Sequence, residues 1–493
     1  MFVKALNRRP GETPAAAPDP ILNFRVLFFL GCMFFLLAWS FMGRNLRLEL
    51  FPVAGAHEVN PLVVIGMLHL AGFMFYLLYK KIIHRTIIII TFAAKILFVG
   101  TVIGFYKPMD ALFAIRFDTL SLLLGLGIIS VILDKAGFFN YMAERVAGYA
   151  GGNLRRAMVL FCLMSFACSL VVNNLTTILI VVPITLKLAA RLRFDPRPLV
   201  IGEIIASNIG GASTMVGDFP NMLISTETGI SFNQFIVFMM PPCLIFLAIL
   251  LVFLSSRAGN CRLAEAASAD SDSQPVVNQT ATNRTLAILA VVVILFVFGN
   301  RLALNPASVA LGGGLAAFFL CGLQRNDILR SLNYDDIIFF IGLFIVVGAI
   351  EATGFLNRVT DLIIFLSGGR VWLSCLFMMW LAALMTAFLN AGPSTAFFLP
   401  VVAGLSINSG THIEWWALSL GVLAGSSATI IGATAGPVAV TMVENFYAEH
   451  DLEMSEGNTI TSEQFSRIGL GMAAMILGLS NIYIIFLSFI LVE

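Results

Sequence analysis

Charge is what this sequence has least of: only 12% of its 493 residues are Asp, Glu, Lys or Arg. A soluble globular chain carries roughly twice that share. Hydrophobic residues make up 59% of the chain, and phenylalanine alone contributes 43 residues. This composition excludes an ordinary soluble domain and predicts long apolar helices. The net charge of +1 comes without a basic stripe, so nucleic acid is not expected as a partner.

Cysteine and histidine are also scarce, with seven and five residues, and neither forms a recognisable pattern. All cysteines except Cys261 lie in apolar stretches, where a thiol behaves as a small hydrophobe. No histidines pair at metal-ligand spacing, and the chain has no phosphate-binding glycine-rich motif. A disulfide framework, a structural metal, a nucleotide partner, ATP-driven pumping and enzyme chemistry therefore have no support. No cofactor is expected beyond a coupling ion, sodium or the proton.

The apolar runs predict an all-α polytopic membrane protein with about eleven transmembrane helices plus two re-entrant hairpins. A helix needs about 20 apolar residues to cross the hydrocarbon layer. Crossings are expected at residues 24–42, 61–79, 86–106, 112–133, 198–224, 235–255, 285–300, 305–322, 335–353, 413–442 and 468–491. Lys and Arg cluster in alternate loops, and such loops stay cytoplasmic. We therefore expect a multi-pass protein of the cell inner membrane with a cytoplasmic N-terminus.

Two segments do not fit a simple crossing. The first, Met158–Ala190, has basic clusters at both ends, and its arm Met158–Val172 would reach only roughly 22 Å as a helix, too little to cross. It breaks at a polar run, Asn173–Thr177. The second, Val371–Ile407, breaks at Asn390–Thr395. Each segment is predicted to be a re-entrant hairpin with a polar tip.

The two hairpins belong to an internal duplication. Residues match at an offset of 217, as in Asp118 with Asp335, Gly125 with Gly342, Asn173 with Asn390 and Pro183 with Pro400. Gly210–Gly217 matches Gly425–Gly432 at an offset of 215. An odd number of crossings separates the copies, which gives them opposite orientations. Inverted repeats are typical of secondary transporters, whose site lies near the midplane.

The duplication divides the chain into five parts. They are an N-terminal tail with scaffold helices at 1–110, a first inverted repeat with its hairpin at 111–255, a cytoplasmic linker at 256–283, a second inverted repeat with its hairpin at 284–443, and an acidic loop with the last helix at 444–493.

Polar residues interrupt the apolar pattern at four repeat-related places: the two hairpin tips and two interrupted helices. Polar backbone is tolerated at membrane depth only where it is buried in protein or lines a wet cavity. Broken helix ends offer N–H groups to anions and C=O groups to cations. The candidate ion- or substrate-binding residues are Asn173, Asn174, Thr176, Thr177, Asn208, Gly210, Thr214, Asp218, Asn221, Asn390, Ser394, Thr395, Ser426, Ser427 and Thr429. The alternative is structural, since small residues also let transmembrane helices pack closely.

Two carboxylates stand within predicted crossings. Asp218 lies between Gly217 and Pro220, and Glu203 lies about four turns earlier. Carboxylates inside a membrane are costly and generally functional, so both residues are candidate proton carriers. Asp218 could instead be a helix-cap acceptor, and Glu203 a carboxylate that pairs helices.

The stretch Ile204–Asn221 resembles the ion transporter superfamily, with the arsenite permease and NhaD-type sodium–proton antiporter branch as the nearest pattern. Asn174–Thr177 followed by Pro183 is similar to the first hairpin of that branch and to the tips of divalent anion–sodium symporters. The resemblance covers roughly residues 110–490. It implies a homodimer with a scaffold domain and a mobile transport domain that works as an elevator. It also implies sodium near both tips, at Asn173, Thr177, Asn390 and Ser394, with substrate between them.

Two departures from that pattern bear on function. Antiporters of this kind carry an acidic residue at the tip where this chain has Asn173 and Asn390, and the motif has proline where this chain has Phe219. The first hypothesis is sodium/proton antiport, in which Asp218 or Glu203 carries the proton. The second is sodium-coupled uptake of a small anion such as a dicarboxylate, citrate or sulfate, or efflux of an oxyanion such as arsenite. A third is a non-transporting membrane scaffold or sensor. The expected partners are a small ion and membrane lipid.

Overall fold

The computed structural model describes residues 61–80, 84–151, 153–192, 194–257, 277–302, 304–449 and 459–491. The chain divides into two units between Gly66 and Met67. The first unit contributes only the start of α3 to the described residues, and everything below concerns Met67–Glu493. The predicted crossing at 24–42, Cys261 and most of the predicted linker lie outside the described residues.

The described residues form twenty helices and no strand. The helices of the first half are α3 (Pro61–Lys80), α4 (Arg85–Ile103), α5 (Pro108–Ala114), α6 (Phe117–Lys135), α7 (Phe138–Ala150), α8 (Leu154–Ser169), α9 (Asn174–Leu192), α10 (Arg197–Ala212), α11 (Phe219–Thr228) and α12 (Phe232–Arg257). Those of the second half are α13 (Gln279–Leu302), α14 (Pro306–Leu320), α15 (Arg325–Ser331), α16 (Tyr334–Ala352), α17 (Phe355–Ser367), α18 (Val371–Leu389), α19 (Ala391–Ser409), α20 (Ile413–Ala428), α21 (Gly436–Glu449) and α22 (Ser462–Leu491).

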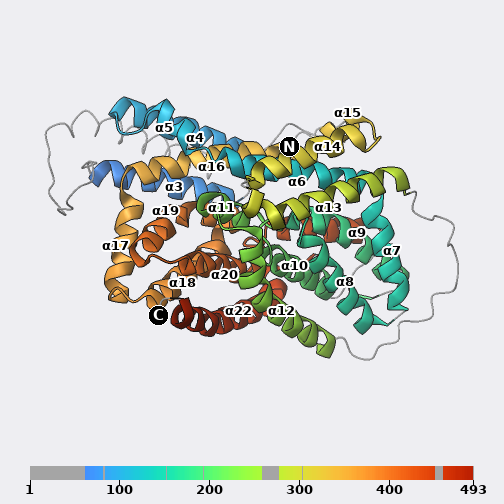
Figure 1. The fold of residues 1–493 in the computed structure, drawn as a ribbon. Helices are drawn as coiled ribbons and strands as arrows, with labels where there is room; N and C mark the ends of the chain where they lie inside the picture. The colour runs from blue at the N-terminus through green and yellow to red at the C-terminus, as the bar shows by residue number, and fades with distance from the viewer. Residues whose placement is uncertain are drawn as a thin grey trace, which may run out of the picture. The chain divides into compact units, whose positions relative to one another are not determined.

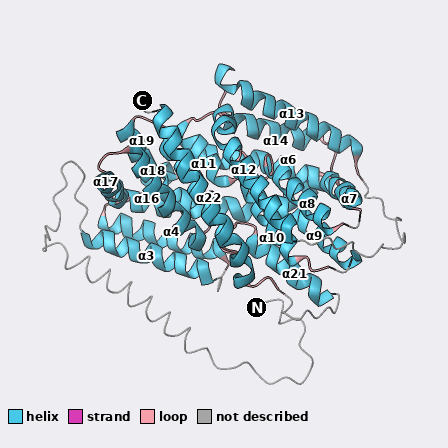
Figure 2. Cartoon of the chain, turned by 90° about the horizontal axis from the view of Figure 1, so that it is seen from below, coloured by secondary structure: helices cyan, strands magenta, loops and turns pink. Residues whose placement is uncertain are grey.

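The two halves repeat the same helices and the same contacts. Helices α5 to α9 begin 217 positions before α15 to α19, as Phe117 and Tyr334 do at the starts of α6 and α16. Corresponding helices pack on corresponding partners. Helix α6 packs on α14 as α16 packs on α4, and α9 contacts α21 as α19 contacts α11. In both views α7 and α17 lie at opposite ends of this unit (Figures 1 and 2). The predicted all-α fold with inverted repeats is confirmed.

Eight of the described helices are long and apolar enough to cross a membrane, or nine if the bent pair α16–α17 forms one span. The prediction of about eleven counted the interrupted helices as single crossings. The structure divides them into α10 with α11 and α20 with α21, whose longest pieces have 16 residues. α14 has only 15 residues. The chain is nonetheless a multi-pass membrane protein, because its long helices are apolar throughout.

Both hairpins are pairs of packed helices, α8 with α9 and α18 with α19. The first turns between Ser169 and Asn174, and the second turns at Asn390, the one residue other than glycine with a positive φ among the described residues, at 81°. α8 has 16 residues, about 24 Å of helix, which is short of the roughly 30 Å hydrocarbon layer. α18 and α19 have 19 residues each and could cross by length. Their assignment to a hairpin follows from their repeat relation to α8 and α9.

Several elements differ from the sequence prediction. The 13-residue helices α7 and α17 are amphipathic additions, each entered through a left-handed glycine, Gly137 or Gly354. Residues 279–283, placed in the linker by the sequence analysis, form the first turn of α13. Residues 444–449 of the predicted acidic loop are the end of α21. Helices α7 and α17 are too short to count as crossings, and the ends of α13 and α21 extend helical backbone into polar residues next to the apolar runs.

The crossing of α6 and α14 depends on glycine. A Cβ on Gly125 would lie 2.6 Å from the Leu311 nitrogen, whereas a Cβ on Gly127 would meet nothing within 4 Å. We therefore expect Gly125→Ala to destabilise the protein by about 1–3 kcal/mol, since the backbones must separate. Gly127→Ala should be neutral or slightly stabilising. Thermal unfolding in detergent measures both, and equal melting temperatures would contradict this account of the crossing.

Candidate functional site

The two interrupted helices meet at the centre of the candidate site. α10 packs against α20, and the Asn208 Nδ2 donates to the Ser426 carbonyl at 3.1 Å. Ser419 donates to the Asn221 Oδ1 at 2.7 Å. These bonds cross between the repeats and involve Asn208, Asn221 and Ser426, three predicted site residues. The structure therefore brings the two helix interruptions together, as the inverted repeat requires.

A matched pair of threonines ties each interruption to its hairpin. Thr214 donates to the Leu170 carbonyl at 2.6 Å and accepts from the Gly217 nitrogen at 3.0 Å. Thr429 does the same with the carbonyl of Ala387, at 2.6 Å, and the nitrogen of Gly432, at 2.9 Å. Each threonine accepts from a backbone N–H of its own helix break and donates to one of the last carbonyls of the first hairpin arm, so it joins the break to the hairpin. Thr214 and Thr429 thus hold the two helix breaks against the hairpins.

The tip of the first hairpin enters the site through Asn174. Its Oδ1 accepts a short hydrogen bond from Ser169, and its Nδ2 donates to the Asn208 Oδ1 at 3.3 Å. Asn174 is 1% exposed and Asn208 equally so. A chain of buried amides therefore runs from the hairpin through α10 to the Ser426 carbonyl of the other repeat.

Asp218 lies beside this chain of amides. It is the N-cap of α11, its Oδ1 accepts from the Phe219 nitrogen at 2.9 Å, and it interacts with the side chain of Asn174. The cap interpretation is thus correct, yet it uses only one oxygen. Asn221 stabilises the same break by donating to the carbonyls of Ala212 and Thr214, at 3.0 and 2.9 Å.

Gly211 allows Asn174 and Asp218 to pack closely against the helix break. A Cβ on Gly211 would lie 2.5 Å from the Asn174 Oδ1, 3.0 Å from the Asp218 Cβ and 3.1 Å from the Gly217 carbonyl oxygen. The Asn174 amide, the Asp218 side chain and the Gly217 carbonyl therefore pack against Gly211, where a larger residue would displace them. Gly210 differs, because a Cβ there would strike the Phe166 backbone, so Gly210 is a packing residue. We call Asn174, Asn208, Gly211, Gly217 and Asp218 the amide–carboxylate cluster.

The amide–carboxylate cluster exists in only one repeat. At the offset of 217 the counterpart of Asn174 is Ala391, and at the offset of 215 the counterpart of Asp218 is Ala433. The second hairpin instead has Asn390, whose Oδ1 accepts from Thr434 at 3.1 Å. Thr395 donates to its own helix at Ala391, and Ser426 to Leu423. The symmetric scaffold thus holds an asymmetric site.

Three predicted hydroxyls are buried without a hydrogen-bond partner: Thr177, Ser394 and Ser427. Thr177 and Ser394 are repeat counterparts, and both are 0% exposed. A buried polar group left unpaired costs about 1–3 kcal/mol, so such groups usually mark a bound water or ion. Both hairpins therefore carry an unused oxygen at the same position.

Asn173 and Thr176 face a cavity instead of the cluster. The cavity, of about 230 Å³, is lined by α6, the first hairpin tip and residues 331–337, and we call it the Asn173 cavity. Asn173 also caps α9, with its Oδ1 2.8 Å from the Leu175 nitrogen. Asp134 and Lys135 lie at the exposed end of the cavity lining. The Asn173 cavity thus leads from solvent to the first hairpin tip.

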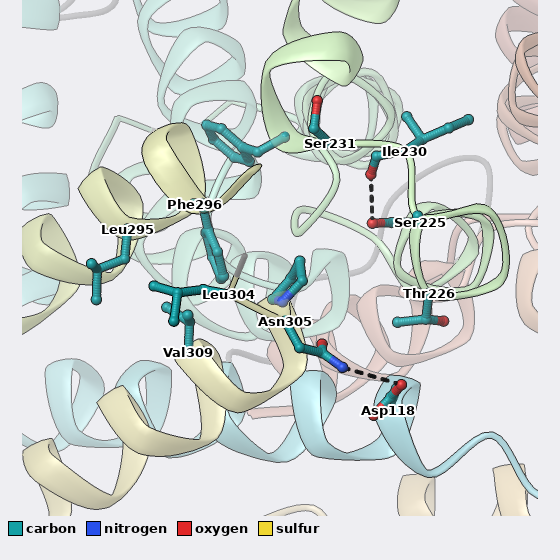
Figure 3. Close-up of a pocket in the computed structure, with 14 residues that line it drawn as sticks. Asp118, Ser225, Thr226, Ile230, Ser231, Leu295, Phe296, Leu304, Asn305 and Val309 are labelled. Carbon is teal, nitrogen blue, oxygen red and sulfur yellow. Dashed lines mark hydrogen bonds between the residues drawn. The ribbon is translucent and has the colours of Figure 1, made fainter. Parts of the chain in front are cut away.

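A second cavity, of about 240 Å³, lies where the α11–α12 and α13–α14 connections meet the first turn of α6 (Figure 3). Its polar groups are largely used by their neighbours: Asn305 donates to Asp118 at 3.3 Å, and Ser225 donates to the Ile230 carbonyl at 3.0 Å. None of the predicted site residues lines it.

Glu203 lies outside the amide–carboxylate cluster. It is 0% exposed, accepts a short hydrogen bond from Thr185, and leaves its second oxygen buried and unpaired. Eight residues of α10 separate it from Gly211, about 12 Å along the helix. Sequence analysis missed a similar carboxyl, Glu414 in α20, which is 0% exposed and accepts from Thr411 at 2.9 Å. Glu414 is not the repeat counterpart of Glu203, which corresponds to Leu418 or Leu420 at the two offsets, so the sequence pattern gave no signal for it.

The site lacks positive charge. Among the described residues, no lysine or arginine forms an ion pair with Asp218 or Glu203, and the ion pairs lie elsewhere, as Arg116–Glu227 at 2.8 Å and Arg197–Asp195 at 2.9 Å do. The same residues contain no group of three His, Cys, Asp or Glu suited to a metal ion. Amide, carbonyl and hydroxyl oxygens with one carboxylate suit a hard monovalent cation or a proton, not a transition metal.

Comparison with known proteins identifies the family. The Citrate transporter (CitMHS) family model matches residues 73–421. The magnetosome protein MamN of Paramagnetospirillum magneticum is 34% identical, over 85% of this chain and 99% of its own length. An uncharacterized transporter of Mycobacterium tuberculosis is 30% identical, over 83% of this chain and 95% of its own.

A solved structure supports the fold. The YdaH transporter of Alcanivorax borkumensis aligns with 83% of this chain and 99% of its own at a TM-score of 0.56, with 13% sequence identity. The inverted repeats, the paired helix interruptions and the match to most of the chain agree. The chain belongs to the citrate transporter family and is a secondary transporter.

Proposed function

We propose that this transporter couples the movement of sodium and protons, as in antiport, and that the amide–carboxylate cluster is where the two cations compete. The observation that carries this proposal is Asp218, a buried carboxylate that faces Asn174 in a helix break and has no basic partner among the described residues. An unpaired carboxylate inside a membrane protein needs a cation or a proton to be stable.

The roles within the site follow from the contacts. Asp218 supplies the negative charge and interacts with the Asn174 side chain beside Gly211, and Thr177 adds an unused hydroxyl on the same hairpin. Ser394 is its counterpart on the second hairpin. We assign one strong cation site to the first repeat and leave the second hairpin, with Asn390 and Ser394, to a weaker sodium site or to substrate. We assign Glu203, which lies in the same helix α10 as Gly211, as a separate proton carrier.

The second candidate is sodium-coupled uptake of a small anion such as citrate, another dicarboxylate or sulfate, or efflux of an oxyanion. Two observations favour it: the family model carries the description Citrate transporter, and both hairpin tips carry amides where the antiporter pattern has acids. An anion here would bind through helix ends and the bound cation, since the cluster offers no basic side chain.

Purified protein in liposomes separates the two candidates. A sodium gradient should move protons, read with an internal pH dye, if the antiport proposal holds. Labelled citrate, succinate, sulfate and arsenite should accumulate with sodium if the anion proposal holds. Proton movement without anion uptake supports antiport, sodium-dependent anion uptake supports the alternative, and neither flux from a folded protein overturns both.

We place this activity in the cell inner membrane, with a cytoplasmic N-terminus, in a homodimer that works as an elevator. The Lys and Arg distribution supports the orientation. The Ile204–Asn221 motif supports the arsenite permease and NhaD-type branch within the wider superfamily. Under this orientation the Asn173 cavity opens to the cytoplasm.

The unpaired hydroxyls give a testable consequence. We expect Thr177→Val to leave the sodium-free protein equally or more stable, because it removes an unsatisfied buried group. The rise in melting temperature caused by sodium should shrink. Thr285→Val is the matched control: Thr285 is equally buried but bonded to Ala281 at 2.8 Å, so it should lose stability and keep its response to sodium. A full sodium response in Thr177→Val would remove Thr177 from the site.

A further inference from the structure

The repeat relation predicts which side chains should lie at the second hairpin tip. A cavity at the first hairpin tip should have a partner at the second, because α6, α9 and α21 correspond to α16, α19 and α11. The Asn173 cavity is lined by Leu123 of α6 and Leu175 of α9. Their counterparts at the offset of 217 are Phe340 and Gly392.

An aromatic pair occupies the corresponding place in the second repeat. Phe340 of α16 stacks on Phe219, the first residue of α11, with ring centroids 3.4 Å apart and planes 14° from parallel. Both residues are buried, at 8% and 4% exposure. A Cβ on Gly392 would lie 2.8 Å from Phe340 and 3.4 Å from Phe219. The rings therefore lie directly against the second hairpin tip.

The sequence accounts for the difference between the two sides. Phe219-Pro220 and Gly436-Pro437 begin α11 and α21 at the same offset of 217. The aromatic pair of one side thus corresponds to Gly436 and Leu123 on the other. Leu123 lines the open Asn173 cavity, whereas its counterpart Phe340 is buried in the stack with Phe219. Phe219 is also the residue that replaces proline in the helix-break motif.

We propose that Phe219 and Phe340 form a gate that closes access to the second hairpin while the first is open. Transport by an inverted repeat requires the open and closed sides to exchange, and the stack is the contact that must part for the second side to open. The inference does not depend on which ion is carried.

The gate adjoins the amide–carboxylate cluster through one peptide bond. The Phe219 nitrogen donates to the Asp218 Oδ1, so the carboxylate holds the backbone that carries the gate ring. A cation or proton on Asp218 competes for the same oxygens. Occupancy of the cluster is thereby linked to the position of Phe219, which is what coupling between binding and opening requires.

Cysteine labelling in detergent tests the gate without any assumption about sidedness or substrate. In a protein without its seven native cysteines, Thr176→Cys reports on the Asn173 cavity and Pro393→Cys, its repeat counterpart, on the second tip. A bulky water-soluble maleimide should label Thr176→Cys quickly and Pro393→Cys slowly. Adding Phe340→Leu, which copies Leu123, should raise the Pro393→Cys labelling rate about tenfold or more, because the buried stack is lost.

The reciprocal substitution distinguishes opening of the gate from general unfolding of the protein. Leu123→Phe should slow labelling of Thr176→Cys, and general loosening of the fold cannot protect a thiol. Rapid labelling of Pro393→Cys with both phenylalanines intact would overturn the gate, as would unchanged protection after Phe340→Leu. Because the readout is access and not flux, failure of the proposed ion coupling would leave this result unaffected.

Discussion

Asp218→Asn should reduce sodium- and proton-coupled flux by about 100-fold or more. The amide keeps the size of the side chain and can still accept from the Phe219 nitrogen, so the α11 cap survives. What disappears is the negative charge that faces Asn174 beside Gly211. Losing the charged partner of a bound cation costs roughly 3 kcal/mol or more, which is about two orders of magnitude in binding.

Proton and sodium fluxes in liposomes measure this effect, and Asp361→Asn is its control. Asp361 is exposed on α17 and carries the same charge change. We expect the control to transport normally. If proton-coupled flux of Asp218→Asn stays within a few-fold of that of the parent protein, Asp218 is not the proton carrier. Glu203 would then be the next residue to substitute.

The arrangement of the helices could be predicted from the sequence because the sequence contains the same pattern twice. A match at 217 positions located both hairpins, and the interruptions after Gly210 and Gly425 appear as the breaks that divide α10 from α11 and α20 from α21. Polar residues at membrane depth are so costly that their positions carry information even in a single sequence.

The asymmetry of the site could not be predicted in the same way. The family resemblance implied sodium sites at both tips, but which polar groups converge depends on side-chain directions at residues as distant as Asn174 and Asp218. The Phe219–Phe340 stack joins positions 121 residues apart on unrelated elements, and only the replaced proline at Phe219 hinted at it. Glu414 was missed because it follows no motif and gains its setting from burial alone.

Gly211→Ala should lower coupled flux about tenfold or more while the fold persists. Its added methyl group would meet the end of the Asn174 side chain at 2.5 Å, and a side chain can turn aside where a backbone cannot. Turning Asn174 away breaks its side-chain interaction with Asp218 and the amide chain to Asn208. The cost in stability should stay near 1–3 kcal/mol, the usual range for overpacking.

Substitutions at two further glycines distinguish damage to the site from damage to the fold. Gly210→Ala would press on the Phe166 backbone, so it should destabilise the protein more than Gly211→Ala does. Gly471→Ala lies on an exposed face of α22 with nothing within 4 Å, and it should leave flux and melting temperature unchanged or slightly raise the latter. Sodium-induced thermal shifts and fluxes on all three variants make the comparison. Normal sodium response in Gly211→Ala would show that sodium binding does not depend on the position of the Asn174 side chain, which the added methyl group must displace.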